Sequence, residues 1–479
     1  MLRAFEQFLA MTDRGTLWVG ADAESLRLLR QEVAATLHRL LVWERPWLEA
    51  QRGILWPYQE LAKRYRSFQQ LAENTTDLFQ QQQAQLFLAL LPFPRQWQWL
   101  LQVERRFGGI SELQGFLTAE ARSVADKIEH KPQKAYKLRH FCQVLKGYRG
   151  AREKGILRIF SIPYLLVALH PRMLSRISAR YVIFAEPPMG ILFRHTWWRH
   201  FANLADPCVI GIASPEDRAF LRQQASVEVA PLAHGDFLND REPEGAGITK
   251  DYAIVFNATF DDMPRKRHEL MLELLRHPLL IEAKTLFLGR GRDENVAALE
   301  RRVRQLGLEK RVTIAANVRR EEVPGHLARC RMGVHLSLYE NACRSIYEFF
   351  RADLPCVISS SMAGMNPEIF NDQTGMAVSD ADLPKAIDST LQHLERFAPR
   401  RWFLEHSGSR HSSRRLNEVF RTLFSRWGYE WREDIVALAS SGANRYAEAS
   451  DYERFRNDFR WLLDCLQQGT ARPSLFTLE

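Results

Sequence analysis

Cysteine is scarce in this 479-residue sequence, and its spacing excludes two classes of small stabilised fold. The six cysteines include no pair separated by only two or three residues, so neither a zinc ribbon nor a disulfide scaffold is expected. Scattered single cysteines are typical of reduced, buried residues. They therefore favour a protein that works in the cytosol.

Long apolar runs are also lacking. The most apolar segments, 86–91 and 286–288 with their neighbours, are far shorter than the roughly 20 residues that a helix needs to span a bilayer. Glu6 interrupts the apolar residues at the N-terminus, so no signal peptide is expected. We predict a cytoplasmic protein, either soluble or peripheral on the inner membrane face.

Basic residues, in contrast, are abundant. Lys and Arg number 66 against 57 Asp and Glu, which gives a formal net charge of +9. A basic surface favours anionic partners such as nucleotides, phosphates or acidic lipid headgroups. No known nucleic-acid-binding motif occurs, so nucleic acid is not an expected partner. The hydrophobic content of 46% is typical of a globular protein, and the length predicts two to four domains.

The order of expected elements divides the chain into four parts. Residues 1–150 are predicted to be mainly helical, including the basic stretch 117–150, and form with 155–237 an N-terminal domain. After residue 155, short apolar runs alternate with amphipathic segments, which is typical of a parallel α/β sheet. A polar linker at 238–250 leads to a second α/β domain at 251–395, and the helical residues 396–479 are expected to pack across both. The expected strands are 156–160, 181–185, 208–213, 227–230, 252–258, 283–289, 312–315, 332–336 and 356–359.

The most specific stretch is LSLYENACRSIYE at 336–348, where an expected strand ends and a helix begins. Glu340 stands at the mouth of that helix, and Glu348 lies two turns along it. The first amides of the helix are predicted to be unpaired donors that can bind a phosphate. Carboxylates beside such an anion site suit the recognition of ribose and sugar hydroxyls. The same pattern is also typical of an ordinary helix start whose acidic residues complement the helix dipole.

Two further segments follow expected strands of the second α/β domain. MPRKRHEL at 263–270 offers lysine and arginine, which bind a diphosphate as a point charge and as a bidentate fork. A solvated basic helix start is the alternative. FLGRGRDE at 287–294 contains a lone G-x-G pattern, which indicates either a loose approach to a nucleotide or a tight strand–helix turn.

Together these segments resemble the retaining glycosyltransferases of family 4. Glu340 and Glu348 have the E-x7-E spacing of that family, and the resemblance extends over residues 250–385. The flanking segments that resemble its motifs are HLSLYE at 335–340, EFFRADLPCV at 348–357, LGL at 306–308, the Gly364–Glu368 turn and the Asp372–Gly375 strand start. The resemblance implies the GT-B fold, in which two Rossmann-like domains face a cleft.

The resemblance also implies a substrate and a set of site residues. The donor would be a nucleotide-sugar of the UDP or GDP type, with no cofactor and no metal. Glu348 would hold the ribose and Glu340 the sugar hydroxyls, while Lys266, helped by Arg265, would stabilise the diphosphate. Glu186 occupies the position of the family's histidine and is expected to act in catalysis with Glu340 and Lys266. The implied donor site consists of Arg265, Lys266, Gly289, Arg290, Asn317, Val318, Glu340, Asn341, Ala342, Cys343, Arg344, Ser345 and Glu348.

The acceptor is bound by the N-terminal half in this family, and here the sequence leaves alternatives open. A bacterial-type surface glycan, a lipid-linked glycan or a protein are the expected acceptors. Basic and aromatic residues of the N-terminal half are expected either to lie against anionic headgroups or to belong to an ordinary soluble helical domain; they include Arg95, Trp97, Trp99, Arg105 and Arg106. The alternative function is a catalytically inactive GT-B scaffold that binds a nucleotide-sugar, an anionic polymer or a protein partner.

Overall fold

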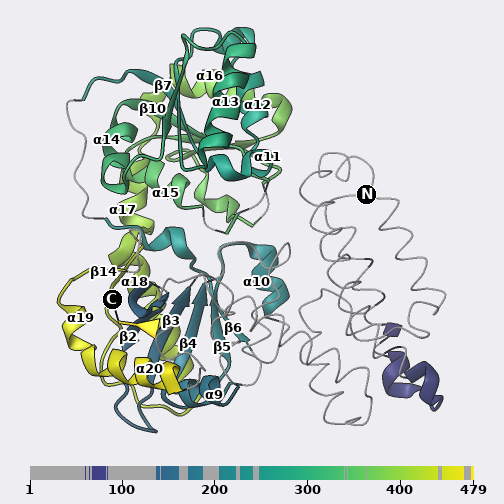
Figure 1. The fold of residues 1–479 in the computed structure, drawn as a ribbon, viewed down its shortest axis with the longest axis vertical. Coiled ribbons are helices and arrows are strands. Elements are labelled where there is room, and N and C mark those ends of the chain that lie inside the picture. The colour runs from purple at the N-terminus through teal and green to yellow at the C-terminus, as the bar shows by residue number, and fades with distance from the viewer. Residues whose placement is uncertain are drawn as a thin grey trace.

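The computed structural model describes two α/β domains (Figure 1). The described residues are 136–140, 142–160, 171–186, 204–222, 227–240, 248–338, 340–341, 343–362, 364–440, 445–468 and 476–478, with scattered positions between 60 and 84. The basic and aromatic residues at 95–106 lie outside these residues.

The C-terminal domain is built on a six-stranded parallel sheet with the strand order of a Rossmann fold. Its order is β12-β11-β10-β7-β8-β9, so the first strand of the domain, β7, pairs with both the second and the fourth. The strand order reverses between β7 and β10. Ligands bind such sheets at this point, beyond the carboxyl ends of the two strands. The strands are β7 (Tyr252–Asn257), β8 (Thr285–Gly289), β9 (Val312–Ala316), β10 (Cys330–His335), β11 (Cys356–Ser359) and β12 (Gly375–Val378).

Helices cover both faces of this sheet, because its strands are apolar on both sides. One face packs Phe256, Phe287 and Val334 against α12, α13 and α16, and the other packs Val255 and Leu286 against α14 and α15. The helices are α11 (Met263–Lys266), α12 (His268–Leu274), α13 (Asp293–Gln305), α14 (Val323–Ala328), α15 (Arg344–Arg351) and α16 (Leu383–Gln392). All expected strands of this domain are confirmed to within two residues at each end.

The N-terminal sheet has five strands, of which the last four are parallel. The first strand falls in the stretch 117–150 that the sequence predicts as helix, and the prediction is wrong for residues 142–146. Its polar residues, Gln143 and Lys146, are three residues apart, which is the spacing of an amphipathic helix. In the structure, however, all five residues of the strand are buried, the two polar ones included. The strands are β2 (Cys142–Lys146), β3 (Gly155–Phe160), β4 (Tyr181–Glu186), β5 (Cys208–Gly211) and β6 (Val227–Ala230).

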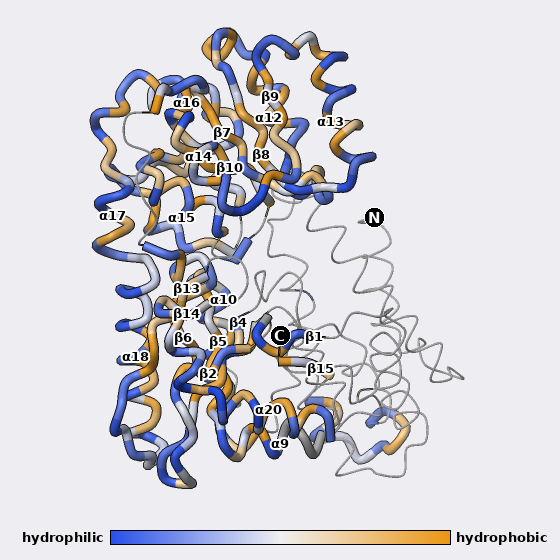
Figure 2. Tube along the Cα trace, turned by 60° about the vertical axis from the view of Figure 1, so that its left-hand side comes forward, coloured by the Kyte–Doolittle hydropathy of each residue, from blue (hydrophilic) through white to orange (hydrophobic). Residues whose placement is uncertain are grey.

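The C-terminal segment completes the N-terminal domain. Leu416, Phe420 and Phe424 of α18 pack on one face of the sheet, and α9 and α20 cover the other (Figure 1). In Figure 2 the hydrophobic residues of α18 lie in the part of the helix beside the sheet of the lower domain, and its first turns are hydrophilic. The helices are α9 (Pro171–Arg180), α10 (Pro215–Leu221), α17 (Pro399–His406), α18 (Gly408–Arg426), α19 (Asp451–Arg454) and α20 (Arg456–Gln468).

The two domains are joined by direct contacts as well as by the chain. The short helix η3 (His234–Phe237), which follows β6, packs against α15, and Leu238 is fully buried in a cluster with residues of the C-terminal domain. The predicted linker at 238–250 therefore begins within the core, because the apolar side chain of Leu238 packs where the chain passes from one domain to the other. Within the described residues, no helix is both long and apolar enough to span a membrane.

Candidate active site

A pocket of about 280 Å³ opens at the point where the strand order of the C-terminal sheet reverses. The loops after β7, β8 and β9 form its floor, and α15 forms a wall. This is the position at which a Rossmann-like sheet binds its ligand. The lining residues are Asn257, Ala258, Thr259, Arg265, Lys266, Leu288, Gly289, Arg290, Val318, Arg320, Val323, Arg344, Ser345 and Glu348.

The charge of the lining indicates an anionic ligand. Five of these residues are lysine or arginine and only one, Glu348, is acidic. Glu340 and Asp262 offset part of this charge from outside the lining, and the remaining excess of cations favours a negatively charged ligand. A diphosphate has the required charge and number of acceptor oxygens. The pocket therefore fits a nucleoside diphosphate better than a neutral ligand.

A tight turn carries Arg265 and Lys266 into the pocket. Pro264 lies in the first turn of α11, where its fixed φ favours a helix start, and Arg267 follows the helix in the left-handed conformation with φ 59°. This conformation is unfavourable for a residue with a side chain, and it is stabilised here by an ion pair of Arg267 with Asp380. Lys266 is only 8% exposed, so its ammonium is directed inward.

Glu340 receives these two cations. Its Oε1 pairs with Lys266 and lies 3.0 Å from Nη1 of Arg265 and 3.5 Å from Nε2 of His335. Burial opposes ionisation of this carboxyl group, yet Lys266, His335 and Arg265 hold its pKa well below the usual value. Glu340 is therefore a fixed carboxylate directly behind the pocket cations. His335 is a contact that the sequence analysis missed, because nothing in the pattern of a buried strand distinguishes it.

Glu348 lines the opposite side of the pocket. Its Oε2 accepts a hydrogen bond of 3.2 Å from Nδ2 of Asn257, and its Oε1 accepts one of 2.9 Å from Nε of Arg344. Arg320 lies 3.7 Å away. Glu348 and Lys266 therefore share one cavity, whereas Glu340 does not line it and contacts it through Lys266. Ser345 joins Arg344 in the same wall.

The loop before α15 differs from the prediction of free amides. The backbone N–H of Cys343 donates to Sδ of Met365 at 3.2 Å, so this amide is already paired, and Ala342 lies outside the described residues. Gly364, with φ 86°, supports this loop from the other side, because a Cβ there would lie 1.7 Å from the carbonyl oxygen of Glu340. The predicted Gly364–Glu368 turn thus holds the Glu340 loop in place.

The G-x-G segment forms the tight turn that was one of its two interpretations. A Cβ on Gly289 would lie 2.1 Å from the carbonyl oxygen of Ala258, so only glycine lets β7 and β8 approach this closely. Gly289 and Arg290 also line the pocket, as does Val318. Asn317 adopts the left-handed conformation and binds both backbone groups of Gly291 through its side chain. Its role in the structure is to fix this turn.

Two other predicted residues lie away from the pocket wall. Asn341 accepts a hydrogen bond of 3.2 Å from the backbone of Ala213, and thereby joins the two domains. Glu186 lies at the end of β4, where its Oε2 accepts from Nε of Arg158 at 2.6 Å. Burial raises the pKa of Glu186 in spite of this arginine. Glu186 is thus held by Arg158 and is not part of the lining of the pocket that contains Lys266.

Two groups of residues have the donor atoms of a metal site. His335, Glu340 and Cys343 have ligand atoms within 4.8 Å of one another. The carboxylate of Glu340 already forms ion pairs with Lys266 and Arg265. A divalent metal ion would have to bind beside both of these positive charges, so the three side chains do not fit such an ion. The Asp380-Ala381-Asp382 sequence has the spacing of a metal motif, but Asp380 pairs with Arg267 and Asp382 with Ser379.

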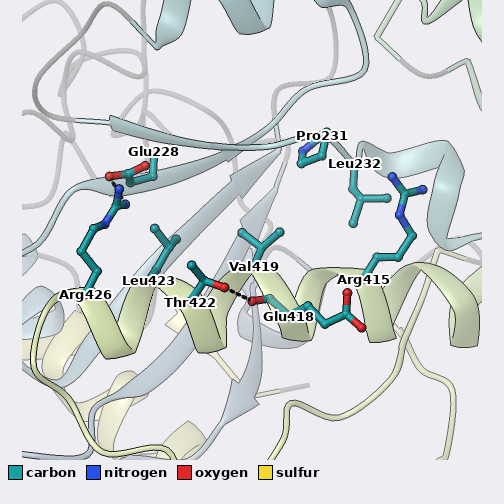
Figure 3. A pocket seen from close by; sticks show the side chains of 9 residues that line it. All are labelled: Glu228, Pro231, Leu232, Arg415, Glu418, Val419, Thr422, Leu423 and Arg426. Atoms are coloured by element: carbon teal, nitrogen blue, oxygen red, sulfur yellow. Dashed lines mark hydrogen bonds and ion pairs between the residues drawn. The ribbon is translucent and has the colours of Figure 1, made fainter.

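A second pocket, of about 430 Å³, lies between β6 and α18 (Figure 3). Two arginines there are balanced by two glutamates, and Arg426 pairs with Glu228 at 2.5 Å. Leu232, Val419 and Leu423 form the apolar part of its surface. Although this pocket has the larger volume, its lining lacks the excess of cationic over acidic residues of the first one.

Comparison with known proteins supports a glycosyltransferase. Residues 251–396 match the family model described as "Glycosyl transferases group 1", and this range coincides with the C-terminal domain. No curated protein matches the sequence.

Similar solved structures include several glycosyltransferases. A point mutant of TarM from S. aureus, in complex with fondaparinux, α-GlcNAc-glycerol and UDP, is 15% identical with a TM-score of 0.41, over 51% of each chain. Anabaena Alr3699/HepE in complex with UDP and glucose is 17% identical with a TM-score of 0.43, over 56% of this chain and 78% of that chain. The lipopolysaccharide outer core galactosyltransferase WaaB is 15% identical with a TM-score of 0.40, over 56% and 75%. The matched region thus spans about half the length of TarM.

The strand topology itself shows the fold class that the sequence analysis expected. Each described domain is a mainly parallel sheet covered by helices, and the domains meet at η3 and α15. This is the two-domain α/β architecture of the GT-B fold.

Proposed function

We propose that this protein is a retaining glycosyltransferase that moves a sugar from a UDP- or GDP-sugar to a glycan-type acceptor. The observation that carries the proposal is the pocket at the strand-order reversal, which five cations line against one carboxylate. The family match of residues 251–396 supports the same reaction class.

The geometry suggests how the chain would stabilise the leaving group. Negative charge develops on the diphosphate as the bond to the sugar breaks, and fixed cations near it lower the barrier. Lys266 and Arg265 are held in position by Glu340 before the substrate binds, so they need little reorganisation. Glu348, fixed by Asn257 and Arg344, would accept hydrogen bonds from the ribose. In this proposal the cations supply the charge stabilisation, and the reaction needs no metal.

The retaining outcome and the acceptor come from the resemblance to family 4. In that mechanism the acceptor attacks the face from which the diphosphate leaves, and a leaving phosphate oxygen takes the proton of the acceptor. A lipid-linked or phosphorylated glycan at an anionic membrane surface is one of the acceptors that the sequence suggests. It stays a prediction, because the residues behind it lie outside those that the structure describes.

The first test is ligand binding. We expect one of UDP, GDP and their sugar conjugates to raise the unfolding temperature of the full chain, since a ligand at 100 times its Kd adds about 2.7 kcal/mol of stability. Lys266→Ala should abolish the shift, whereas Lys385→Ala, at an exposed lysine of the same domain, should leave it unchanged. A chain that binds none of these ligands would contradict the proposal.

The second test is turnover. Slow release of nucleoside diphosphate from the donor identified by binding, lost in Glu348→Gln, would support catalysis. An unchanged rate in excess chelator would support the metal-independent mechanism, and the anomeric configuration of the transferred sugar, read by NMR, would test retention. Tight binding without any turnover or transfer would instead indicate the inactive scaffold.

A further inference from the structure

Arg267 adopts an unfavourable backbone conformation directly after the two buried cations of the pocket. Its φ of 59° and ψ of 45° lie in the left-handed region, and it follows Lys266 in the chain. This region is disfavoured by a factor of about 5 to 30 for a residue with a Cβ, whereas glycine adopts it freely. Such a conformation persists only where the surrounding contacts impose it. The side chain of Arg267 shows which contacts do so here.

The guanidinium of Arg267 is bound by three side chains from two other loops. Its two Nη atoms pair with the two carboxylate oxygens of Asp380, and Nη1 also donates to Oγ of Ser359 at 3.3 Å and to Oγ of Ser361 at 3.4 Å. The Ser359 hydroxyl donates to Asp380 at 2.5 Å and lies 2.7 Å from Oγ of Ser361. We call Arg267, Ser359, Ser361 and Asp380 the Arg267 clamp.

The clamp lies at the edge of the sheet where the pocket opens. Ser359 ends β11, and Asp380 follows β12 by two residues. Both strands run parallel to β10 in the same sheet, so their carboxyl ends share one edge with the strands whose loops form the pocket floor. A second contact reaches the turn from the loop after β10, because the N–H of Leu338 donates to the carbonyl oxygen of Arg265 at 2.9 Å. The turn is thus held on both sides of Lys266 along the chain.

Arg267 itself is directed away from the ligand. It does not line the pocket, its side chain is only 13% exposed, and its charge is balanced by Asp380. It differs in this from Lys266 and Arg265, which both line the pocket. What Arg267 contributes is the backbone conformation in which the chain leaves the turn. The effect of the clamp on the pocket is therefore conformational.

We propose that Arg267 is a positioning residue, whose clamp keeps the left-handed turn formed before the ligand binds and thereby keeps Lys266 and Arg265 directed into the pocket. The inference rests on the proposed function and names the residues that pre-form its diphosphate site. Without the clamp, only the left-handed fraction of the protein would be competent to bind, and the apparent affinity would fall by that fraction.

Calorimetric titration of the full chain with UDP, GDP, UDP-glucose and GDP-mannose tests the inference through two variants that both lose the clamp. Arg267→Ala keeps a Cβ, so we expect Kd to rise about 5- to 30-fold. Arg267→Gly adopts the left-handed turn freely, so its Kd should stay within about threefold of the wild-type value. Equal Kd values in the two variants would overturn the inference.

Asp353 provides the matched control. It lies just beyond the far end of α15, also with a φ of 59°, and accepts a hydrogen bond from the backbone of Arg400. Asp353→Ala and Asp353→Gly should differ from each other in the free energy of unfolding, as the Arg267 pair should, but bind the probes with wild-type affinity. If their affinities differed as much as those of the Arg267 pair, the effect would be one of general stability and the inference would be refuted.

Asp380→Ala tests whether the clamp acts through the conformation of Arg267. In the otherwise wild-type chain this substitution should raise Kd, by up to the factor seen in Arg267→Ala. In the Arg267→Gly background it should raise Kd no further, because a glycine turn does not need the clamp. A rise of the same size in both backgrounds would contradict the inference.

Failure of the proposed function gives a different result. If the wild-type chain binds none of the four probes, the proposed function fails, whereas normal wild-type binding with the contrary outcomes above overturns the positioning inference alone. Urea denaturation of Arg267→Ala, Asp380→Ala and the double variant measures the clamp without a ligand. We expect the two effects on the free energy of unfolding to be non-additive, and additive effects would refute the clamp.

Discussion

The ion pair of Lys266 with Glu340 combines stability with ligand binding, and two variants can separate these roles. Lys266→Met removes the ammonium and keeps most of the side-chain stem. Glu340 is then left 7% exposed, with Arg265 at 3.0 Å and His335 at 3.5 Å as its remaining partners. Removing one partner of a fully buried pair costs about 3–5 kcal/mol, and the two remaining partners reduce this here to about 2–3 kcal/mol.

Adding Glu340→Gln to Lys266→Met should restore the free energy of unfolding, because no uncompensated charge remains buried. It should not restore binding of the nucleoside diphosphate. The lost contact with a phosphate is worth about 1.5–3 kcal/mol, which corresponds to a Kd raised about 10- to 150-fold.

Chemical denaturation and calorimetric titration of the same samples measure the two quantities. Lys385→Met, at an exposed lysine on α16, is the matched control and should change neither. The reasoning about the pair would be refuted if Lys266→Met were as stable as the wild-type protein. Binding by the double variant with wild-type affinity would show that Lys266 does not contact the phosphate.

Three further predictions concern residues around the site. Gly364→Ala should abolish ligand binding and lower the unfolding temperature, because the new Cβ would overlap the Glu340 loop. Gly428 also has a positive φ, but a Cβ there would meet open space. Gly428→Ala should therefore bind ligand normally and lower the unfolding temperature only slightly, through its backbone conformation. Burial lowers the pKa of His268 to about 4, so the unfolded state takes up a proton that the folded state refuses, and about 3 kcal/mol of stability should be lost as the pH falls from about 6.5 to 4. In His268→Phe the denaturation midpoint should lose this pH dependence, and an unchanged pH profile would contradict the assignment. Tyr347→Phe removes the donor to Asp236 and should lower the free energy of unfolding by about 1 kcal/mol, measured by denaturation; no loss would show that this hydrogen bond between the domains is not stabilising.

Much of the C-terminal domain could be predicted from the sequence, because its signals are local. Apolar runs of five or six residues between amphipathic segments locate the strands, and the parallel order follows from the alternation with helices. Lys266 and Glu348 could be named because each lies on a helix that follows a strand, and the starts of such helices converge at one edge of a parallel sheet. The sequence signal failed at β2, which pairs antiparallel to β3 and buries Gln143 and Lys146 among apolar residues.

The roles of individual polar groups depended on distant partners. Glu186 follows a strand, as a catalytic residue of this fold often does, but Arg158 on the neighbouring strand holds it. The amide of Cys343 belongs to a helix start, but Met365, 22 residues further along the chain, already accepts its hydrogen bond. Asn341 and Ala213 are 128 residues apart, and no local pattern relates them.

The sequence by itself therefore determined the second α/β domain, the anion-binding end of its sheet and the residue types that meet there. These follow from the period of apolar residues and from the chemistry of strand ends, which are properties of short segments. Only the tertiary structure decided which carboxylate faces the pocket and which is held in an ion pair behind it. Those outcomes depend on hydrogen-bond partners that the folded chain brings together from segments hundreds of residues apart.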